Sequence, residues 1–252
     1  MEINNGWIEA VKYRTSRRAY IKEKMDRKDI DALKALIKEI NKESGLSFQF
    51  IEDCSKLFQG FSASYGIIKG LNSCIALVSS TKIENYKIKT GYYGEMLVLE
   101  ATHRNLGTCW IGGTYNKKEC QKYVDIKDEE ELICVIAVGR VLEDKTMREK
   151  LISQMGKSRK SFDEILLEKD VDKIADWVKE GIEFVIKAPS AVNKQPVGYS
   201  LLSNEIKAYK TSEKHGYQDI DLGISMLHFE LGARSKNHEG KWSFIKGEKV
   251  YR

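Results

Sequence analysis

Three short segments of this chain combine residue types that bind ligands, and the first lies near its beginning. Arg14, Ser16 and Arg18 stand at every second position of the run Arg-Thr-Ser-Arg-Arg. Side chains two residues apart lie on the same side of an extended chain. Two guanidinium groups and a hydroxyl could therefore converge on one dianionic phosphate through charge-assisted hydrogen bonds. A solvated surface explains the same run, and both interpretations stay open.

The second segment, residues 106–114, reads Leu-Gly-Thr-Cys-Trp-Ile-Gly-Gly-Thr and contains Trp110, Ile111, Gly112 and Gly113. Paired glycines let the backbone approach a planar ligand and direct N–H groups at it, because no side chain intervenes. The segment is not a GxGxxG pattern and does not open a helix. A plain helix C-cap followed by a turn is the alternative.

Both prolines of the 252-residue chain lie in the third segment, residues 188–196, which reads Ala-Pro-Ser-Ala-Val-Asn-Lys-Gln-Pro. Proline fixes its own φ angle and lacks a backbone donor. Ser190 and Asn193, between the two prolines, supply short hydrogen-bonding side chains. This combination predicts a rigid loop that faces a ligand.

Composition narrows the remaining classes of function. Lys and Arg number 42 against 37 Asp and Glu, and the net charge of +5 indicates a mixed surface and no nucleic-acid partner. No apolar run reaches the length of a membrane span, and residues 1–11 lack the apolar core of a signal peptide, so we expect a cytoplasmic protein without membrane contact. Five widely spaced cysteines without a CxxC pair predict reduced thiols and no metal site.

The elements expected to position these segments come in two similar sets, because helix, short loop and strand follow one another twice. Asp29 could cap the first helix, whose apolar residues recur at helical spacing. Continuous apolar runs predict buried strands. The expected helices cover residues 29–44, 91–106, 171–187 and 221–234, and the expected strands cover residues 46–52, 74–78, 132–138 and 197–202.

The helix over residues 221–234 is a loose counterpart of the apolar helix over residues 91–106, with Gly223 matching Gly94. The shared residues are few and the spacings differ, so internal duplication and chance similarity both stay open. A boundary between two halves would fall in the charged stretch of residues 143–160.

Taken together, the three segments resemble the signature segments of the FMN-dependent nitroreductase family. In ordinary family members the proline-serine loop lies early in the chain, and FMN binds at the interface of a homodimer. Here the early position, residues 44–47, reads Ser-Gly-Leu-Ser, and the loop stands in the second half instead. The chain therefore resembles a branch in which two family-like halves are fused into a single-chain pseudo-dimer.

The resemblance implies an α+β fold with a mixed sheet flanked by helices in each half. The first domain, residues 1–155, would carry the arginine and glycine segments, and a shortened second domain, residues 156–252, would carry the proline loop. We expect a monomer, because fused halves already bury the usual dimer interface.

The resemblance also implies one FMN site per chain. Arg14 and Ser16 would hold the phosphate, and Arg18 would approach the ribityl chain or the N1/O2 edge of the flavin. Gly112 and Gly113 would offer backbone N–H groups near N5 and O4. The remaining expected cofactor contacts come from the same two segments and are Trp110, Ile111, Pro189, Ser190, Ala191 and Asn193.

Lys157 and Arg159 have two interpretations. They match a basic pair that some family members place beside the phosphate. Alternatively, residues 158–162 are a degenerate copy of the arginine segment, residues 16–20.

By resemblance, the protein is expected to be an FMN-dependent oxidoreductase. Hydride would pass from NAD(P)H through flavin N5 to a nitroaromatic, a quinone or a similar small electrophile. No side chain is expected to be catalytic, which agrees with the lack of a Ser/His/Asp elbow in the sequence. The alternative is a non-enzymatic flavin-binding protein on the same scaffold.

Overall fold

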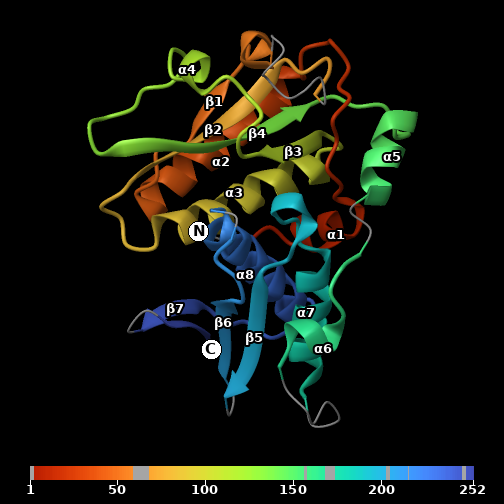
Figure 1. Ribbon diagram of the computed structural model, residues 1–252, viewed down its shortest axis with the longest axis vertical. Helices are drawn as coiled ribbons and strands as arrows, with labels where there is room; N and C mark the ends of the chain where they lie inside the picture. The colour runs from red at the N-terminus through yellow and green to blue at the C-terminus, as the bar shows by residue number, and fades with distance from the viewer. Residues whose placement is uncertain are drawn as a thin grey trace. The chain divides into compact units, whose positions relative to one another are not determined.

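The computed structural model describes residues 3–58, 68–155, 158–167, 174–202, 205–214, 216–245 and 248–252. The chain divides into two compact units (Figure 1). Unit 1 consists of Met1–Gly6, Tyr13–Tyr86 and Met96–Met155, and unit 2 consists of Trp7–Lys12, Lys87–Glu95 and Gly156–Arg252.

The elements of the first 155 residues build a four-stranded antiparallel sheet with the strand order β1-β2-β4-β3. In chain order they are α1 (Gly6–Tyr13), α2 (Arg27–Ser44), β1 (Gln49–Ile51), η1 (Ser55–Phe58), β2 (Ser73–Ser80), α3 (Tyr86–His103), β3 (Gly107–Ile111), α4 (Lys117–Cys120), β4 (Glu130–Gly139) and α5 (Met147–Met155).

Helix α2 has the buried face that its apolar periodicity predicts, but it does not begin at the predicted residue. Leu33 and Ile37 are buried on the face that the spacing predicted, and Gly45 ends the helix in the left-handed conformation with φ 75°. The predicted cap is wrong, because the helix begins at Arg27. Asp29 instead lies in the first turn, where its carboxylate pairs with the Arg104 guanidinium at 3.2 Å.

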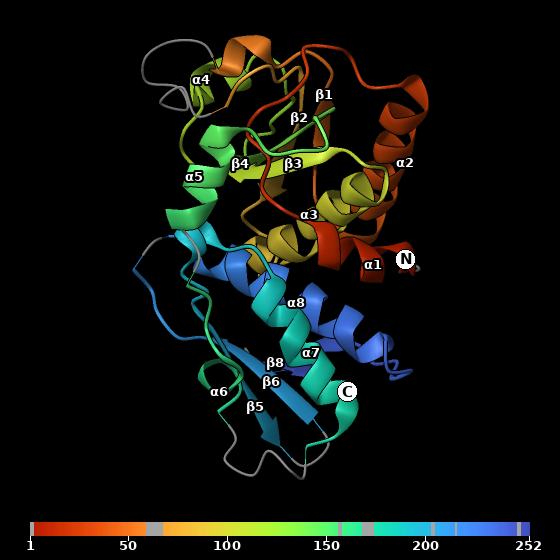
Figure 2. The same cartoon turned by 90° about the vertical axis from the view of Figure 1, so that its right-hand side faces the viewer.

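The sheet of unit 1 is buried on both faces, which explains the continuous apolar runs of β2 and β4. Cys74, Ala76 and Val78 alternate along β2 and pack with residues of η1 and α4. Ile75 and Leu77, which alternate with them along β2, are equally buried. Helix α2 and the second half of α3 lie along one face of this sheet (Figure 2).

The second half of the chain builds another four-stranded antiparallel sheet, with the strand order β5-β6-β8-β7. Helices α7 and α8 pack side by side on one of its faces around a shared apolar core (Figures 1 and 2). Residue 171, where we expected α7 to begin, lies outside the described residues. In chain order the elements are α6 (Phe162–Ile165), α7 (Asp176–Lys187), η4 (Ala191–Asn193), β5 (Val197–Leu202), β6 (Glu205–Lys210), α8 (Gln218–Arg234), β7 (Trp242–Ile245) and β8 (Glu248–Tyr251).

Both sheets have the same topology, which supports two fused halves. In each sheet the first strand lies at one edge, the third strand lies at the other, and the second pairs with the fourth. In each half a helix precedes the first strand, and a long helix connects the second strand to the third. The predicted α+β fold is therefore confirmed. Its named strands are all antiparallel, and the parallel pairing comes from isolated bridges such as Ser16 to Thr108.

The first half of α3 crosses α8 through two glycines within unit 2. A Cβ atom at Gly91 would overlap the carbonyl oxygen of Ile220, and one at Gly223 would overlap the carbonyl oxygen of Ile88. The two Ile-x-x-Gly sequences thus contact each other reciprocally, as expected at a twofold-like contact. This crossing matches Gly223 with Gly91 and corrects the match with Gly94.

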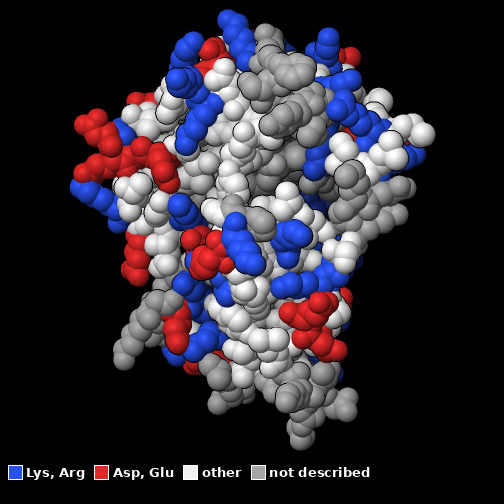
Figure 3. Space-filling view, viewed as in Figure 1, with Lys and Arg blue, Asp and Glu red and all other residues white. Residues whose placement is uncertain are grey.

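The face drawn in Figure 3 carries Lys and Arg as well as Asp and Glu side chains, in agreement with the mixed charge of the sequence. Among the residues described, none of the helices combines the length and the apolar character that crossing a membrane requires.

We expect Gly223→Ala to destabilise the protein. Helix propensity alone would stabilise α8 by about 1 kcal/mol, whereas overlap with a backbone carbonyl should lower the free energy of unfolding by about 1–3 kcal/mol. Urea unfolding shows whether the substitution raises or lowers the free energy of unfolding. Lys38→Ala, on the exposed face of α2, is the control and should change stability by less than about 0.5 kcal/mol. A Gly223→Ala variant as stable as the parent protein would contradict the close crossing.

Candidate functional site

The arginine segment of unit 1 is extended and runs alongside the edge strand β3. The Arg17 N–H donates to the Thr108 carbonyl at 2.8 Å, and the Tyr20 N–H donates to the Lys69 carbonyl at 2.8 Å. The Lys69 N–H in turn donates to the Arg18 carbonyl at 2.9 Å. The segment is therefore fixed through its backbone, which leaves the side chains of alternate residues free to face the two sides.

Arg18, Arg14 and Ser16 all influence the thiol of Cys109 in β3. Burial raises the pKa of this thiol, while the positive charges of Arg18 and Arg14 and a hydrogen bond with Ser16 act in the opposite direction. All three side chains are half-buried, whereas Arg17 between them is buried. The spacing of two residues thus places the predicted phosphate ligands together, as an extended segment should.

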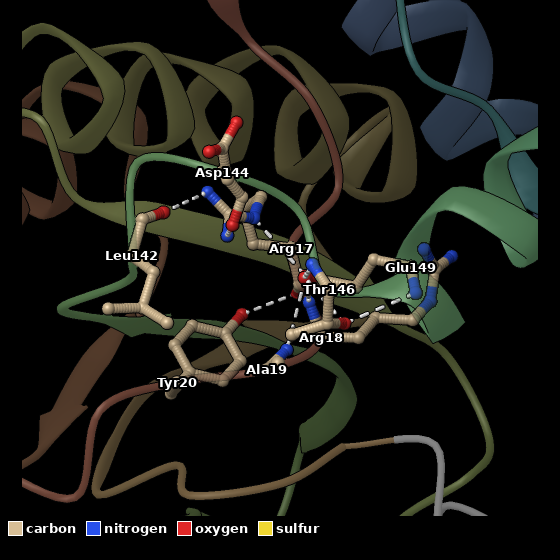
Figure 4. Close-up of polar contacts among 8 residues, drawn as sticks. All are labelled: Arg17, Arg18, Ala19, Tyr20, Leu142, Asp144, Thr146 and Glu149. Carbon is tan, nitrogen blue, oxygen red and sulfur yellow. Dashed lines mark hydrogen bonds and ion pairs between the residues drawn. The ribbon is translucent and has the colours of Figure 1, made fainter.

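Glu149, at the beginning of α5, holds this segment in place (Figure 4). Its Oε1 accepts the N–H groups of Arg18 at 2.7 Å and Ala19 at 3.2 Å, and the Nε of Arg17 at 3.2 Å. Its Oε2 accepts the N–H of Thr146 at 3.0 Å, and the Glu149 N–H donates to the Thr146 hydroxyl at 3.3 Å. The last pair is a capping box, which starts α5 and aims the carboxylate.

The carboxylate of Glu149 is ionised in this environment. Only 3% of the residue is exposed. Burial raises the pKa of Glu149, but hydrogen bonds from the backbone of Arg18 and Thr146 and from the side chain of Arg17 outweigh it and lower the pKa to about 2. Donors that bind the charged form have this effect.

Arg17 extends the same network to the loop before α5. Its guanidinium donates to the carbonyls of Leu142 at 2.9 Å and Asp144 at 3.2 Å, and its own carbonyl accepts the Tyr20 hydroxyl at 2.8 Å (Figure 4). Arg17 is therefore an internal tie of unit 1, and its neighbours on either side face the candidate site.

Lys145 joins Arg14 and Arg18 in what we call the cationic cluster. Burial lowers the pKa of Lys145, and the charges of Arg17, Arg14 and Arg18 lower it further, while Glu149 opposes them. The charges of three arginines and one carboxylate thus all act on Lys145. Sequence reasoning missed Lys145 because it lies in a charged stretch without a pattern.

The glycine segment is mainly a strand. Residues 107–111 form β3, which pairs with β4, and α3 already ends at His103. The alternative of a helix C-cap and turn is therefore wrong for these residues. Trp110 is half-buried and Ile111 is buried, and the chain leaves the sheet at half-buried Gly112 and exposed Gly113.

The proline loop of unit 2 contains three left-handed residues that are not glycine. Val192 has φ 45°, Asn193 has φ 55° and Gln195 has φ 44°. This conformation is strained for a β-branched residue and costs about 1–3 kcal/mol. Val192 is also 76% exposed, so packing of its own side chain does not stabilise the conformation.

Hydrogen bonds to neighbouring segments hold the loop instead. The Gln195 N–H donates to the Ser190 hydroxyl at 2.9 Å, and the Gln195 side-chain amide donates to the Ile186 carbonyl at 3.1 Å and accepts the Lys160 N–H at 2.9 Å. The Asn193 side chain donates to the Ser158 carbonyl at 3.2 Å. The polar residues of the loop are thus used to hold its own conformation, and its predicted contact with a ligand stays a prediction.

Arg159 lies on the inner side of this loop, at the end of α7. Its Nη1 donates to the carbonyls of Ala188, at 2.9 Å, and Ile186. A cation suits the carbonyl end of a helix. Lys157 lies outside the described residues, and both interpretations of the basic pair stay predictions.

Asp221, on α8, holds the backbone of the proline loop through a hydrogen bond. Its Oδ1 accepts the Ala191 N–H at 2.9 Å, and only 5% of the residue is exposed. Burial raises the pKa of Asp221 to about 7, although the Ala191 hydrogen bond acts against it. Nothing in the local sequence distinguishes this aspartate from a surface one.

A second buried carboxylate of unit 2 contacts His228. The pair is fully buried, with His228 Nε2 3.0 Å from Glu95 Oε1 and Nδ1 3.1 Å from the Phe184 carbonyl. A carbonyl only accepts a hydrogen bond, so Nδ1 is the donor in the contact with Phe184. Both side chains therefore have a structural role within unit 2.

The predicted cofactor residues thus form two groups. The arginine and glycine segments lie in unit 1, and the proline loop lies with Arg159 in unit 2. Within the described part of the chain, no three His, Cys, Asp or Glu residues are arranged to hold a metal ion.

Comparison with known families identifies the fold. Residues 7–233 match the family model described as "Putative TM nitroreductase". The chain belongs to this nitroreductase family. The match covers the first sheet, strands β5 and β6 and nearly all of α8, and it leaves out β7 and β8. It supports an oxidoreductase in general terms.

Several solved structures are similar to this chain, and one with a TM-score above 0.5 agrees with the nitroreductase fold. A "putative nitroreductase" from Thermotoga maritima is 23% identical, with a TM-score of 0.65, over 100% of this chain and 94% of that chain. An FMN-dependent nitroreductase from Clostridium difficile is 18% identical, with a TM-score of 0.45, over 55% of this chain and 90% of that chain. A nitroreductase family protein from Streptococcus pneumoniae is 16% identical, with a TM-score of 0.48, over 65% and 100%. No curated protein sequence matches significantly.

Glu149→Gln should destabilise the nitroreductase fold by about 3 kcal/mol at pH 7, because it leaves the buried Arg17 without its charged partner. The folded-state pKa is lowered from 4.5 to about 2. The stabilisation is therefore complete above pH 4.5 and disappears as the pH falls towards 2. Urea unfolding between pH 7 and pH 3 should show the difference from the parent protein shrinking. Exposed Glu143, changed to Gln, is the control; equal losses in both variants would refute the role of Glu149.

Asp221→Asn should have the opposite effect. The folded-state pKa of Asp221 is raised from 3.8 to about 7, so its contribution to stability is lost as the pH rises through 7. At about 1.4 kcal/mol per pKa unit, the variant should be more stable by up to about 4 kcal/mol at pH 8 and no more stable at pH 4. Thermal unfolding at the two pH values measures this. Asp219→Asn, on the same helix turn, should show no such gain.

Proposed function

We propose that this member of the nitroreductase family is an FMN-dependent oxidoreductase. The observation that carries the proposal is the cationic cluster beside Ser16, which Glu149 and Arg17 hold in a fixed position. FMN, when bound, would supply the hydride chemistry, accepting from NAD(P)H and donating to a nitroaromatic, a quinone or a similar small electrophile.

The donors of unit 1 fit the phosphate of FMN. Arg14 and Arg18 offer planar guanidinium forks, which suit bidentate hydrogen bonds to phosphate oxygens. Lys145 adds a compact charge, and Ser16 adds a hydroxyl. A dianionic phosphate would offset the mutual repulsion that lowers the pKa of Lys145. The same cations without an anion would repel one another, so the arrangement favours an anionic ligand.

We assign the remaining contacts to the glycine pair and the proline loop. Gly112 and Gly113 would direct backbone N–H groups at the reactive edge of the flavin, next to Trp110 and Ile111. The loop would present its strained backbone to the ring system. In this proposal the loop residues in contact with the flavin are Pro189, Ser190, Ala191 and Asn193.

The residues of this chain would bind and orient FMN without carrying out the chemistry themselves. Arg18 would place a positive charge near the N1 edge, which stabilises added negative charge there. Cys109 lies among the phosphate ligands, but burial raises the pKa of its thiol, so it is a poor nucleophile. We therefore assign no catalytic side chain.

An absorbance scan of the purified protein tests this function. We expect flavin bands as purified or after addition of FMN, and anaerobic NADH or NADPH should bleach them. Reoxidation by a quinone or a nitroaromatic would complete the cycle. Bound flavin that neither nicotinamide reduces would indicate a non-enzymatic flavin-binding protein, and a protein that takes up no FMN would refute both.

Arg14→Ala combined with Arg18→Ala should abolish retention of FMN, and Lys145→Ala should weaken binding about 10-fold to 100-fold. Each variant removes charge-assisted hydrogen bonds worth about 1.5–3 kcal/mol. Arg148→Ala, exposed on α5 beside Glu149, is the matched control and should bind FMN normally. Equilibrium dialysis with FMN measures all four proteins. Undiminished binding by the double variant would exclude the cationic cluster as the phosphate site.

A further inference from the structure

The carboxylate of Asp221 lies directly behind the proline loop. Its Oδ1 accepts the N–H of Ala191 at 2.9 Å. Ala191 precedes the left-handed residues Val192 and Asn193. Among the residues described, this N–H is the one hydrogen-bond donor that reaches the carboxylate. The hydrogen bond from α8 therefore reaches the loop directly before its strained residues.

A small cavity adjoins the carboxylate. It offers about 10 Å³ of space to a water molecule, and its polar lining comes from Asp221, Ser190, Gln195 and Ser225. This volume is close to the minimum that one water needs, and the site has the several polar partners that a buried water requires. A water there would link the carboxylate to the two loop residues, Ser190 and Gln195, that close the loop.

Among the residues that the structure describes, no cation acts on the carboxylate of Asp221. The titratable groups on the elements around it are engaged elsewhere. Asp219 of the same helix pairs with Lys210 at 2.9 Å, and His228 faces Glu95 and the Phe184 carbonyl. Arg159 and Lys160, in the segment before α6, donate to backbone carbonyls, and Lys187 at the end of α7 lies over the Phe184 ring. The only described group that favours the ionised carboxylate is thus the loop N–H itself.

We propose that Asp221 is a positioning residue that ties the flavin-binding loop to α8 when ionised and loosens it when protonated. This inference rests on the proposed function, because it assigns flavin binding to that loop. A hydrogen bond to an ionised acceptor is roughly twice as strong as a neutral one. Protonation of Asp221 therefore weakens the tie that holds Ala191, and the strained residues after it lose their support.

Thermodynamic linkage between FMN binding and the ionisation of Asp221 makes the effect of this hydrogen bond measurable. If the ordered loop binds FMN, then FMN binding favours the ionised form of Asp221, and the ionised form binds FMN more tightly. The pKa of about 7 places the change between pH 6 and pH 8. The FMN phosphate also titrates near pH 6, so only the difference between the parent protein and a variant isolates Asp221.

The experiment measures the dissociation constant of FMN at pH 6, 7 and 8 for the parent protein, Asp221→Asn and Asp219→Asn. Asn keeps a neutral acceptor, so Asp221→Asn should match the parent at pH 6 and bind about tenfold more weakly at pH 8, a change that corresponds to one such strengthened hydrogen bond. Asp219→Asn should follow the parent at every pH. Because Asp221→Asn should be the more stable protein at pH 8, unfolding cannot explain its weaker binding.

Identical pH profiles of the parent protein and Asp221→Asn would overturn the proposal. If none of the proteins binds FMN, the proposed function fails. A measurement on the loop without cofactor then tests the role of Asp221. Amide hydrogen exchange of Ala191 in the cofactor-free protein at pH 8, followed by NMR, should be about tenfold faster in Asp221→Asn than in the parent, since exchange reports local opening. Equal exchange rates would overturn the role of Asp221 independently of any flavin.

Discussion

The buried carboxylate of Glu149 is the interaction on which unit 1 depends. It joins the arginine segment, the loop before α5 and α5 itself through one pair of oxygens. Glu149 binds Arg17 directly, and its charge also acts on Lys145 together with the charges of Arg14 and Arg18. Since its pKa is lowered to about 2, Glu149 keeps its negative charge beside these basic groups. Under the proposed function, the phosphate of FMN would add a second negative charge there.

Unit 2 also contains a buried carboxylate that accepts a backbone N–H, but the pKa of this carboxylate shifts in the opposite direction. Asp221, like Glu149, is a buried helix carboxylate that accepts a backbone N–H from a segment that the sequence predicts to face a ligand. Glu149 has several donors and a buried arginine, and the pKa of its carboxyl falls to about 2. Asp221 has one donor, and burial raises its pKa to about 7. The number of donors decides whether such a carboxylate is a permanent support or one that responds to pH.

The sequence predicts those elements whose own residues determine them. Helices α2 and α7 follow from apolar periodicity, and β2 and β4 follow from apolar runs that are buried on both faces. Strand β3 was missed because its glycine and threonine resemble a turn, and β6 was missed because lysine and glutamate alternate with its apolar residues. Their strand conformation comes from pairing with β4 and with β5 and β8, which local patterns do not contain.

The candidate site likewise contains residues that the sequence predicts and residues that it does not. The residues that would face the ligand were recognisable from motifs, whereas those that hold the motifs in place were not. Glu149 contacts Arg18 across 131 positions and Asp221 contacts Ala191 across 30, so no local spacing reveals either contact. The Thr146-x-x-Glu149 capping box is a readable signal, but only for the start of a helix. Val192 makes the case most clearly: valine disfavours the left-handed region, so its conformation follows from the hydrogen bonds around the loop and could not follow from the loop sequence alone.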